Sequence, residues 1–188
     1  MTLCCDFLAL RLALCGKGKE GYDFAAKRAA LLQKHDGVQV HLLESIAAYF
    51  YALQGRPEQA PELFREHKLA EVSFFGPCRP MMSLIEQQVW LAQGEYVKVI
   101  AHSEGLLRRC EAMHYGLVGL QARIQLAAAQ LRFGPAGRGP GATLAAALLD
   151  AVQDDFWVLF VEQYPALAPH AGRGGLGRLR AASGGPIR

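Results

Sequence analysis

Long apolar runs and an ordered set of cysteines are both missing from this chain of 188 residues. No stretch approaches the roughly 18 uninterrupted apolar residues of a membrane-spanning helix, so we expect no contact with a membrane. The 5 cysteines are an odd number without a framework of regular spacings, and no convincing secretory signal precedes them. We therefore expect reduced thiols in a cytoplasmic protein.

Signatures of catalysis and metal binding are also missing. Only five serines occur, and none lies within Gly-x-Ser-x-Gly, the nucleophile elbow of hydrolases. Neither Cys-x-x-Cys nor His-Glu-x-x-His is present. The nearest group of metal-binding side chains, Cys110 with His114 and His102, is better explained as a core cysteine with polar or interfacial histidines. The sequence thus predicts no enzyme, with no catalytic residue, no metal and no cofactor.

Acidic residues stop at Glu162, which leaves the charge unevenly placed. The chain has 20 Lys and Arg against 17 Asp and Glu, and 4 of the arginines follow Glu162, so residues 1–162 carry 16 − 17 = −1. A nucleic-acid footprint normally shows as a basic stripe on an ordered face. We therefore expect no specific binding of nucleic acid.

Four glycines recur at a nearly fixed interval, and each ends an apolar run. They are Gly16, Gly55, Gly94 and Gly134, with intervals of 39, 39 and 40 residues. Each precedes the polar start of a second amphipathic run, where a helix needs a left-handed residue in order to stop and turn. We interpret each glycine as a hinge, meaning the residue that ends one helix and turns the chain into the next.

The hinges divide the chain into helix pairs. Apolar residues three or four apart, such as Met82, Ile85 and Val89, give each helix a buried stripe. In the helix after Gly94, His102 shares this spacing with Val99 and Leu106 and is counted in the stripe. The helices predicted before the hinges are Thr2–Cys15, Val38–Gln54, Pro80–Gln93 and Gly116–Phe133, and those predicted after them are Gly21–Lys34, Pro57–Lys68, Tyr96–Met113 and Ala142–Val152.

Such pairs bury their faces by stacking on one another. The predicted fold is therefore all-α, an α-α superhelix of tetratricopeptide-like helix pairs with about four repeats of 39–40 residues. The Gly-Pro-rich residues 135–141 are expected to prevent a regular helical start there. We expect a helical repeat domain over residues 1–169 and a disordered Gly/Arg-rich tail over residues 170–188.

Two segments resemble the helical repeat region of large ATP-dependent LuxR-type (MalT-like) transcription regulators. They are Leu-Ala-Gln-Gly-Glu-Tyr at 91–96 and Phe-Val-Glu-Gln-Tyr-Pro-Ala-Leu-Ala-Pro at 160–169, and the resemblance spans residues 38–169. It implies a sensor superhelix that lies between an ATP-binding module and a DNA-binding helix-turn-helix. Residues 16–19 lack the spacing and hydroxyl of a phosphate loop, so the chain fits the repeat region alone.

Candidate binding residues follow from alignment on the hinges. Helical solenoids bind through a concave face lined mainly by the first helix of each pair. Residues on that face that could contact a protein or a small-molecule effector are Tyr51, Gln87, Trp90, Arg123 and Gln130. The alternative is that the aromatic members only fill gaps between repeats.

Two functions remain open at this point. The first is an effector-sensing or protein-interaction module of a LuxR-type regulator, without its own ATPase or DNA-binding parts. The second is a stand-alone tetratricopeptide-like adaptor or scaffold that binds peptide segments.

Overall fold

The computed structural model describes residues 37–72, 74, 76–133, 138–153 and 156–170. Every regular element within these ranges is helical, which confirms the predicted all-α class. The expected helices Thr2–Cys15 and Gly21–Lys34, the hinges Gly16 and Gly134, and the tail beyond residue 170 lie outside the described residues. The chain divides into two compact units, Met1–Gln93 (unit 1) and Gly94–Arg188 (unit 2).

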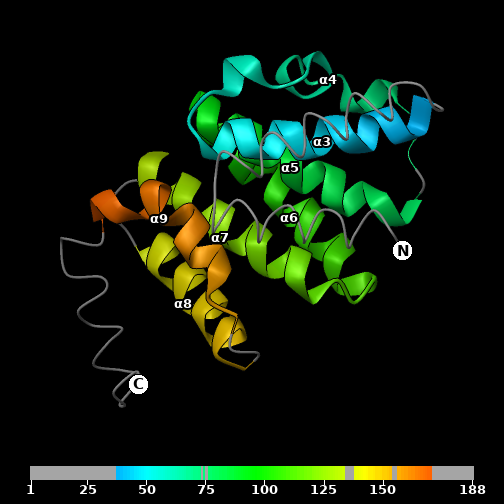
Figure 1. Ribbon diagram of the computed structural model, residues 1–188. Helices are drawn as coiled ribbons and strands as arrows, with labels where there is room; N and C mark the ends of the chain where they lie inside the picture. Colours follow the sequence, from blue (N-terminus) through cyan, green and yellow to red (C-terminus); the bar gives the residue numbers. More distant parts are fainter. Residues whose placement is uncertain (1–36, 73, 75, 134–137, 154–155, 171–188) are drawn as a thin grey trace. The chain divides into compact units, whose positions relative to one another are not determined.

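Unit 1 is organised by two long helices, α3 (Gly37–Leu53) and α5 (Arg79–Gln93), which pack side by side (Figure 1). Both begin and end within one residue of the predicted bounds. Tyr49, Ile85 and Val89 are fully buried between them, as expected from the apolar spacing. Burial of such side chains is worth roughly 1.5–3 kcal/mol each, which explains how the pair holds together.

Gly55 ends α3 in the predicted left-handed conformation, with φ of +69°. The Arg56 N–H donates to the Tyr51 carbonyl at 2.9 Å, and the Gly55 N–H donates to the Ala52 carbonyl at 3.1 Å. This pair of bonds is a Schellman motif, which satisfies the last carbonyls of a helix. Gly94 ends α5 with φ of +81°, so two of the four predicted hinges are confirmed.

The helix predicted over Pro57–Lys68 is wrong. The structure has three short elements here: η1 (Pro57–Gln59), α4 (Glu62–Arg65) and η2 (Lys68–Glu71), followed by η3 (Gly76–Cys78) before α5. Pro61 has no N–H, and a residue before proline is driven out of the helical region. Ala60 accordingly adopts an extended ψ of 144° and interrupts the helix.

Unit 2 is built around α7 (Gly116–Phe133), against which α6 (Tyr96–Ala112), α8 (Arg138–Gln153) and α9 (Val158–His170) all pack. Figure 1 shows α8 and α9 beside α7. Ile124 on α7, Ala147 on α8 and Leu159 on α9 are fully buried in their shared core. The predicted bounds hold within one residue for α6 and α7.

Two expectations for unit 2 need correction. Residues 135–141 do not exclude a helical start, because α8 begins at Arg138 and includes Pro140. Proline is tolerated in the first helical turn, where its missing N–H has no partner in any case. The buried stripe predicted for α6 is also incomplete, since Val99 and Leu106 are buried while His102 is exposed.

The outer side of α9 is apolar as well as its inner side. Trp157, which immediately precedes α9, and Val161 and Tyr164 within it are 42%, 69% and 58% exposed and lie three or four residues apart. Leu159 and Gln163, on the opposite side of the helix, are buried. We call the three exposed residues the α9 stripe.

Candidate functional site

The structure places the predicted binding residues in both units, and each unit is described separately. In unit 1, Tyr51 is half-buried, whereas Gln87 is 1% and Trp90 is 5% exposed. In unit 2, Arg123 and Gln130 lie half-buried on α7. Whether these residues contact a partner stays a prediction.

Trp90 is held inside unit 1 by a histidine that the sequence analysis did not select. Its indole N–H donates to Nδ1 of His67 at 2.5 Å, and the two rings meet edge to face with centroids 5.6 Å apart. Because Nδ1 accepts this bond, His67 carries its ring proton on Nε2. His67 has φ of +61°, so the contact is made from a backbone conformation that few side chains adopt.

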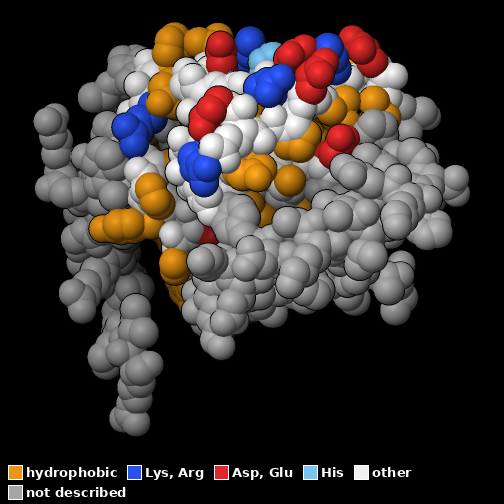
Figure 2. All heavy atoms as spheres, turned by 45° about the horizontal axis from the view of Figure 1, so that its top comes forward, with side chains coloured by type: hydrophobic (Ala, Val, Ile, Leu, Met, Phe, Trp, Pro, Cys, Tyr) orange, Lys and Arg blue, Asp and Glu red, His pale blue; other side chains and the backbone are white. Residues whose placement is uncertain are grey.

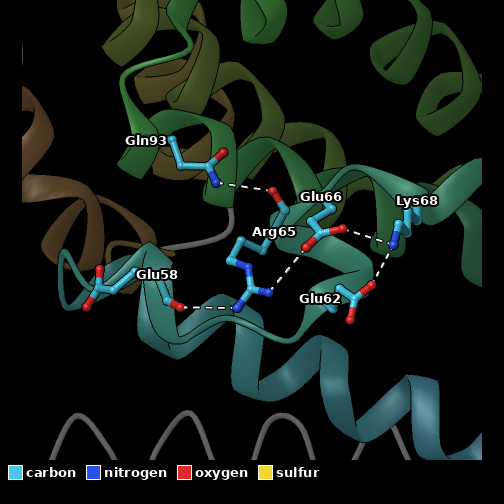
Figure 3. Close-up of polar contacts among 6 residues, drawn as sticks. All are labelled: Glu58, Glu62, Arg65, Glu66, Lys68 and Gln93. Carbon is cyan, nitrogen blue, oxygen red and sulfur yellow. Dashed lines mark hydrogen bonds and ion pairs between the residues drawn. The ribbon is translucent and has the colours of Figure 1, made fainter.

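A network of charged side chains fixes the short elements around His67 (Figure 3). The Arg65 guanidinium donates to the Glu58 carbonyl at 3.4 Å and to Glu66 at 3.3 Å, and Lys68 donates to Glu62 at 2.5 Å. The hydrogen bond from Lys68 holds the pKa of Glu66 below its ordinary value. Exposed ion pairs contribute little to the free energy of folding. The network therefore links the short elements to one another without adding much stability.

Acidic and basic side chains alternate over this face of unit 1 in the space-filling view (Figure 2). The Nε2 of Gln93, at the end of α5, also donates to the Arg65 carbonyl at 3.3 Å. The described side chains of this face thus carry both signs of charge close together.

Two polar side chains of α5 have unusual surroundings. Neither Nε2 nor Oε1 of Gln87 has a hydrogen-bond partner within the described part of the chain. The residues seven before Gly55 and Gly134 in the sequence, Ala48 and Ala127, are small and fully buried. One residue earlier, burial raises the pKa of the Glu86 carboxyl to about 7.

Unit 2 contains a hollow of about 690 Å³, which falls within the range that small-molecule sites occupy. It is formed by the end of α6, the turn into α7, the first half of α7 and the end of α8. We call it the α7 hollow. Its lining residues are Leu107, Cys110, Glu111, His114, Tyr115, Gly116, Leu117, Gly119, Leu120, Arg123, Asp150, Gln153 and Phe156.

Arg123 is the predicted binding residue that lines the α7 hollow. Its Nη1 donates to Oδ2 of Asp150 on α8, and the two side chains are 41% and 43% exposed. Seven residues later on α7, Gln130 Oε1 accepts a hydrogen bond at 3.0 Å from the Thr143 hydroxyl on α8. The two contacts pair α7 with α8 in opposite chain directions, and Arg123 and Asp150 both line the hollow.

The turn from α6 into α7 brings a strained histidine to the α7 hollow. His114 has φ of +54°, and the Tyr115 N–H donates to the Cys110 carbonyl at 2.8 Å. This is the Schellman geometry seen at Gly55, with histidine in the place that glycine usually takes. Histidine is moderately enriched in this conformation, but without a glycine no signal in the sequence marked the position. Strain of this kind is often retained at functional sites.

The thiol in the α7 hollow is unsuited to nucleophilic chemistry. Cys110 is 3% exposed, and burial raises its pKa, whereas a reactive cysteine has a lowered pKa. His114, predicted one turn after it, is exposed. Among the described residues, no three His, Cys, Asp or Glu side chains come together in a way that could hold a metal ion.

Comparisons with family models, curated proteins and solved structures find no match to this chain. Among the described residues no helix is long and apolar enough to cross a membrane.

Proposed function

We propose that this chain is a non-catalytic helical repeat module that binds an effector in the α7 hollow. The observation that carries the proposal is the hollow itself, which combines a drug-sized volume, an oriented Arg123 and a strained His114. Pockets with a few convergent polar groups among apolar ones are the usual form of a ligand site. The buried Cys110 thiol, with its raised pKa, favours binding over catalysis in the hollow.

Two features support a tetratricopeptide-like repeat as the framework of this module. Gly55 and Gly94 end helices 39 residues apart with the same left-handed backbone. Equivalent positions also have equivalent burial, because Ala48, Gln87 and Ala127 are 0%, 1% and 0% exposed. A superhelical stack of such pairs is the arrangement that we propose for the whole chain.

We further propose that the module is the sensor region of a LuxR-type regulator. The segment at 91–96 that carries this resemblance forms the turn from α5 into α6, and the closing segment at 160–169 lies within α9. Genomic context tests the assignment. Coding sequence for an ATP-binding module upstream and for a helix-turn-helix downstream supports it, and unrelated neighbours argue against it.

One observation, the α9 stripe, supports the alternative function of an adaptor for peptide segments. Exposed aromatic and aliphatic side chains at helical spacing are typical of surfaces that dock another helix. Val161→Glu should abolish peptide binding to the stripe and leave a small effector in the α7 hollow unaffected. The opposite pattern would favour the effector module.

A small-molecule screen by NMR on the isotope-labelled full chain tests the hollow. The compounds should include neutral, anionic and cationic molecules and short peptides. Leu117→Trp adds bulk to a half-exposed residue of the hollow, and Val97→Trp introduces the same side chain at an exposed residue of α6 outside it. We expect ligands that lose at least roughly tenfold in affinity with Leu117→Trp alone. Equal binding to both variants, or no shift of hollow residues by any compound, would refute the proposal.

A further inference from the structure

We propose that the ligand of the α7 hollow is an organic carboxylate with an apolar body, and that Arg123 is the residue that binds the carboxylate. This inference rests on the proposed function and narrows it to one chemical class. A free organic acid and the C-terminal carboxylate of a peptide share this chemistry.

The donors of Arg123 that bond no other described residue are the first argument. A guanidinium has five N–H groups in a fixed planar fork, which matches the two oxygens of a carboxylate. The contact with Asp150 is made through Nη1, so the edge formed by Nε and Nη2 keeps two N–H groups side by side. The side chain is more than half covered, which strengthens a charge-assisted bond relative to one in open water.

The ion pair between Arg123 and Asp150 favours an anionic ligand over a cationic one. Asp150 is already paired with Arg123, so an anion can add to the guanidinium without breaking that ion pair. A cation would have to compete with Arg123 for Asp150 or depend on Glu111, an exposed residue of α6. The buried Cys110 thiol is neutral and therefore favours neither an anion nor a cation. No acidic residue lies in the first turn of α7, whose positive end is at Gly116 in the hollow.

The apolar body follows from the rest of the lining. Leu107, Leu120 and Phe156 border the same space as Arg123. The Phe156 N–H donates to the Ala151 carbonyl at 3.0 Å, which fixes the backbone of Phe156 at the end of α8. A volume of about 690 Å³ exceeds what a bare inorganic anion would fill. The hollow therefore suits a molecule with one charged end and an aliphatic or aromatic remainder.

A matched set of probes tests this inference on the full chain. The probes are 4-phenylbutanoate, its primary amide and 4-phenylbutylamine, which share the apolar body and differ in the charged end. We expect the carboxylate to bind roughly ten- to a hundredfold more tightly than the amide, with shifts in hollow residues. N-acetyl trialanine, with a free or an amidated C-terminus, distinguishes a peptide ligand from a free organic acid. If the ligand is the C-terminus of a peptide, the free form should compete with 4-phenylbutanoate and the amidated form should not.

Variants separate binding from folding. Arg123→Gln should lose affinity by roughly the same ten- to a hundredfold, and Arg123→Lys, which keeps the charge without the fork, should lose less. Arg108→Gln is the control, since Arg108 is 73% exposed on α6 and lies outside the hollow. Asp150→Asn keeps an acceptor for Arg123 and removes a negative charge, so carboxylate affinity should not fall. Circular dichroism and thermal melting confirm that each variant is folded.

The outcomes differ for the two proposals. Binding of the amide or the amine in the hollow with affinity equal to that of the carboxylate overturns the inference and leaves the effector-binding function in place. Retention of carboxylate affinity in Arg123→Gln also overturns it. If neither these probes nor any compound of the broader screen shifts residues of the hollow, the proposed function fails with it.

Discussion

The Arg132 guanidinium on α7 donates to the carbonyl oxygen of Pro165 on α9, at 3.2 Å. In a regular helix this carbonyl would accept from the N–H four residues later, but that residue is Pro169, which has none. A second bond, at 3.4 Å, reaches the Ala166 carbonyl. A side chain from one helix therefore completes the backbone hydrogen bonding of another.

Arg132→Ala should lower the free energy of unfolding of unit 2 by about 0.5–1.5 kcal/mol, the usual net value of such a hydrogen bond. Amide exchange within α9 should accelerate more than exchange within α6. Arg108→Ala removes an exposed ion pair with Glu104 and should cost at most about 0.5 kcal/mol. Equal costs for the two variants, measured by chemical denaturation, would show that the Arg132 bonds do not hold α9.

Gly94→Ala should destabilise the chain by about 1–2 kcal/mol, because an L-residue is strained at φ of +81°. An added Cβ would meet nothing within 4 Å at Gly94, so the cost comes from the backbone alone. Gly116, in the first turn of α7, has equally open surroundings. Gly116→Ala should be neutral or stabilising by up to about 1 kcal/mol. Similar thermal shifts for both variants would contradict the hinge at Gly94.

Leu159→Ala and Val161→Ala compare the two sides of α9. Leu159 is fully buried against α7 and α8, and its truncation should cost about 2–5 kcal/mol. Val161 is 69% exposed, and its truncation should change stability by less than about 0.5 kcal/mol. Denaturant titration of both variants measures the difference, and a large cost at Val161 would mean that another element covers the α9 stripe.

Glu86 should make the stability of unit 1 depend on pH. Its pKa is about 7 in the folded chain and 4.5 as the ordinary value. Between these values the folded chain holds a proton that the unfolded chain has released, so the free energy of unfolding falls as the pH rises. Glu86→Gln should remove this fall, and Glu71→Gln, on an exposed side chain, is the control. Chemical denaturation at pH 5 and pH 8 measures this change in the free energy of unfolding. An equal change in the wild type and in Glu86→Gln would contradict the role of Glu86.

Gln87→Met should stabilise unit 1 by about 1–3 kcal/mol, because it removes two buried amide atoms that bond no described residue, at nearly constant volume. The same variant tests the prediction that Gln87 belongs to a binding surface. A residue that serves only the core can be replaced without loss of any ligand found in the screen. Destabilisation would show that the amide has a partner in the folded chain.

The sequence was sufficient for the elements that depend on local chemistry. Apolar spacing and the glycine hinges predicted α5, α6 and α7 closely, since a left-handed turn at Gly94 is a property of glycine itself. The helix predicted over Pro57–Lys68 was wrong because Pro61, four residues into it, lacks an N–H and prevents a helical backbone at Ala60. The resulting αL backbone at His67 could not be inferred from its residue type.

The candidate site was only partly predictable. Alignment on the hinges selected Arg123, which lines the α7 hollow, but it could not reveal Asp150, 27 residues away in sequence. That partnership depends on how α7 and α8 pack. Trp90 was selected as a possible partner contact, with packing between repeats as the alternative, and its 5% exposure agrees with packing. Its bond to His67 could not be predicted, because His67 comes from a segment without regular periodicity.

The two side-chain links between α7 and α8 have a mechanical consequence. Two contacts, Arg123 with Asp150 and Gln130 with Thr143, join α7 to α8 at points seven residues apart on each helix. Two such contacts resist a change in the crossing angle between the helices better than one contact does. Loss of the Arg123–Asp150 contact alone would leave the end of α8 near Asp150 held by the packing of Ala151, while the end near Thr143 would keep its side-chain link to α7.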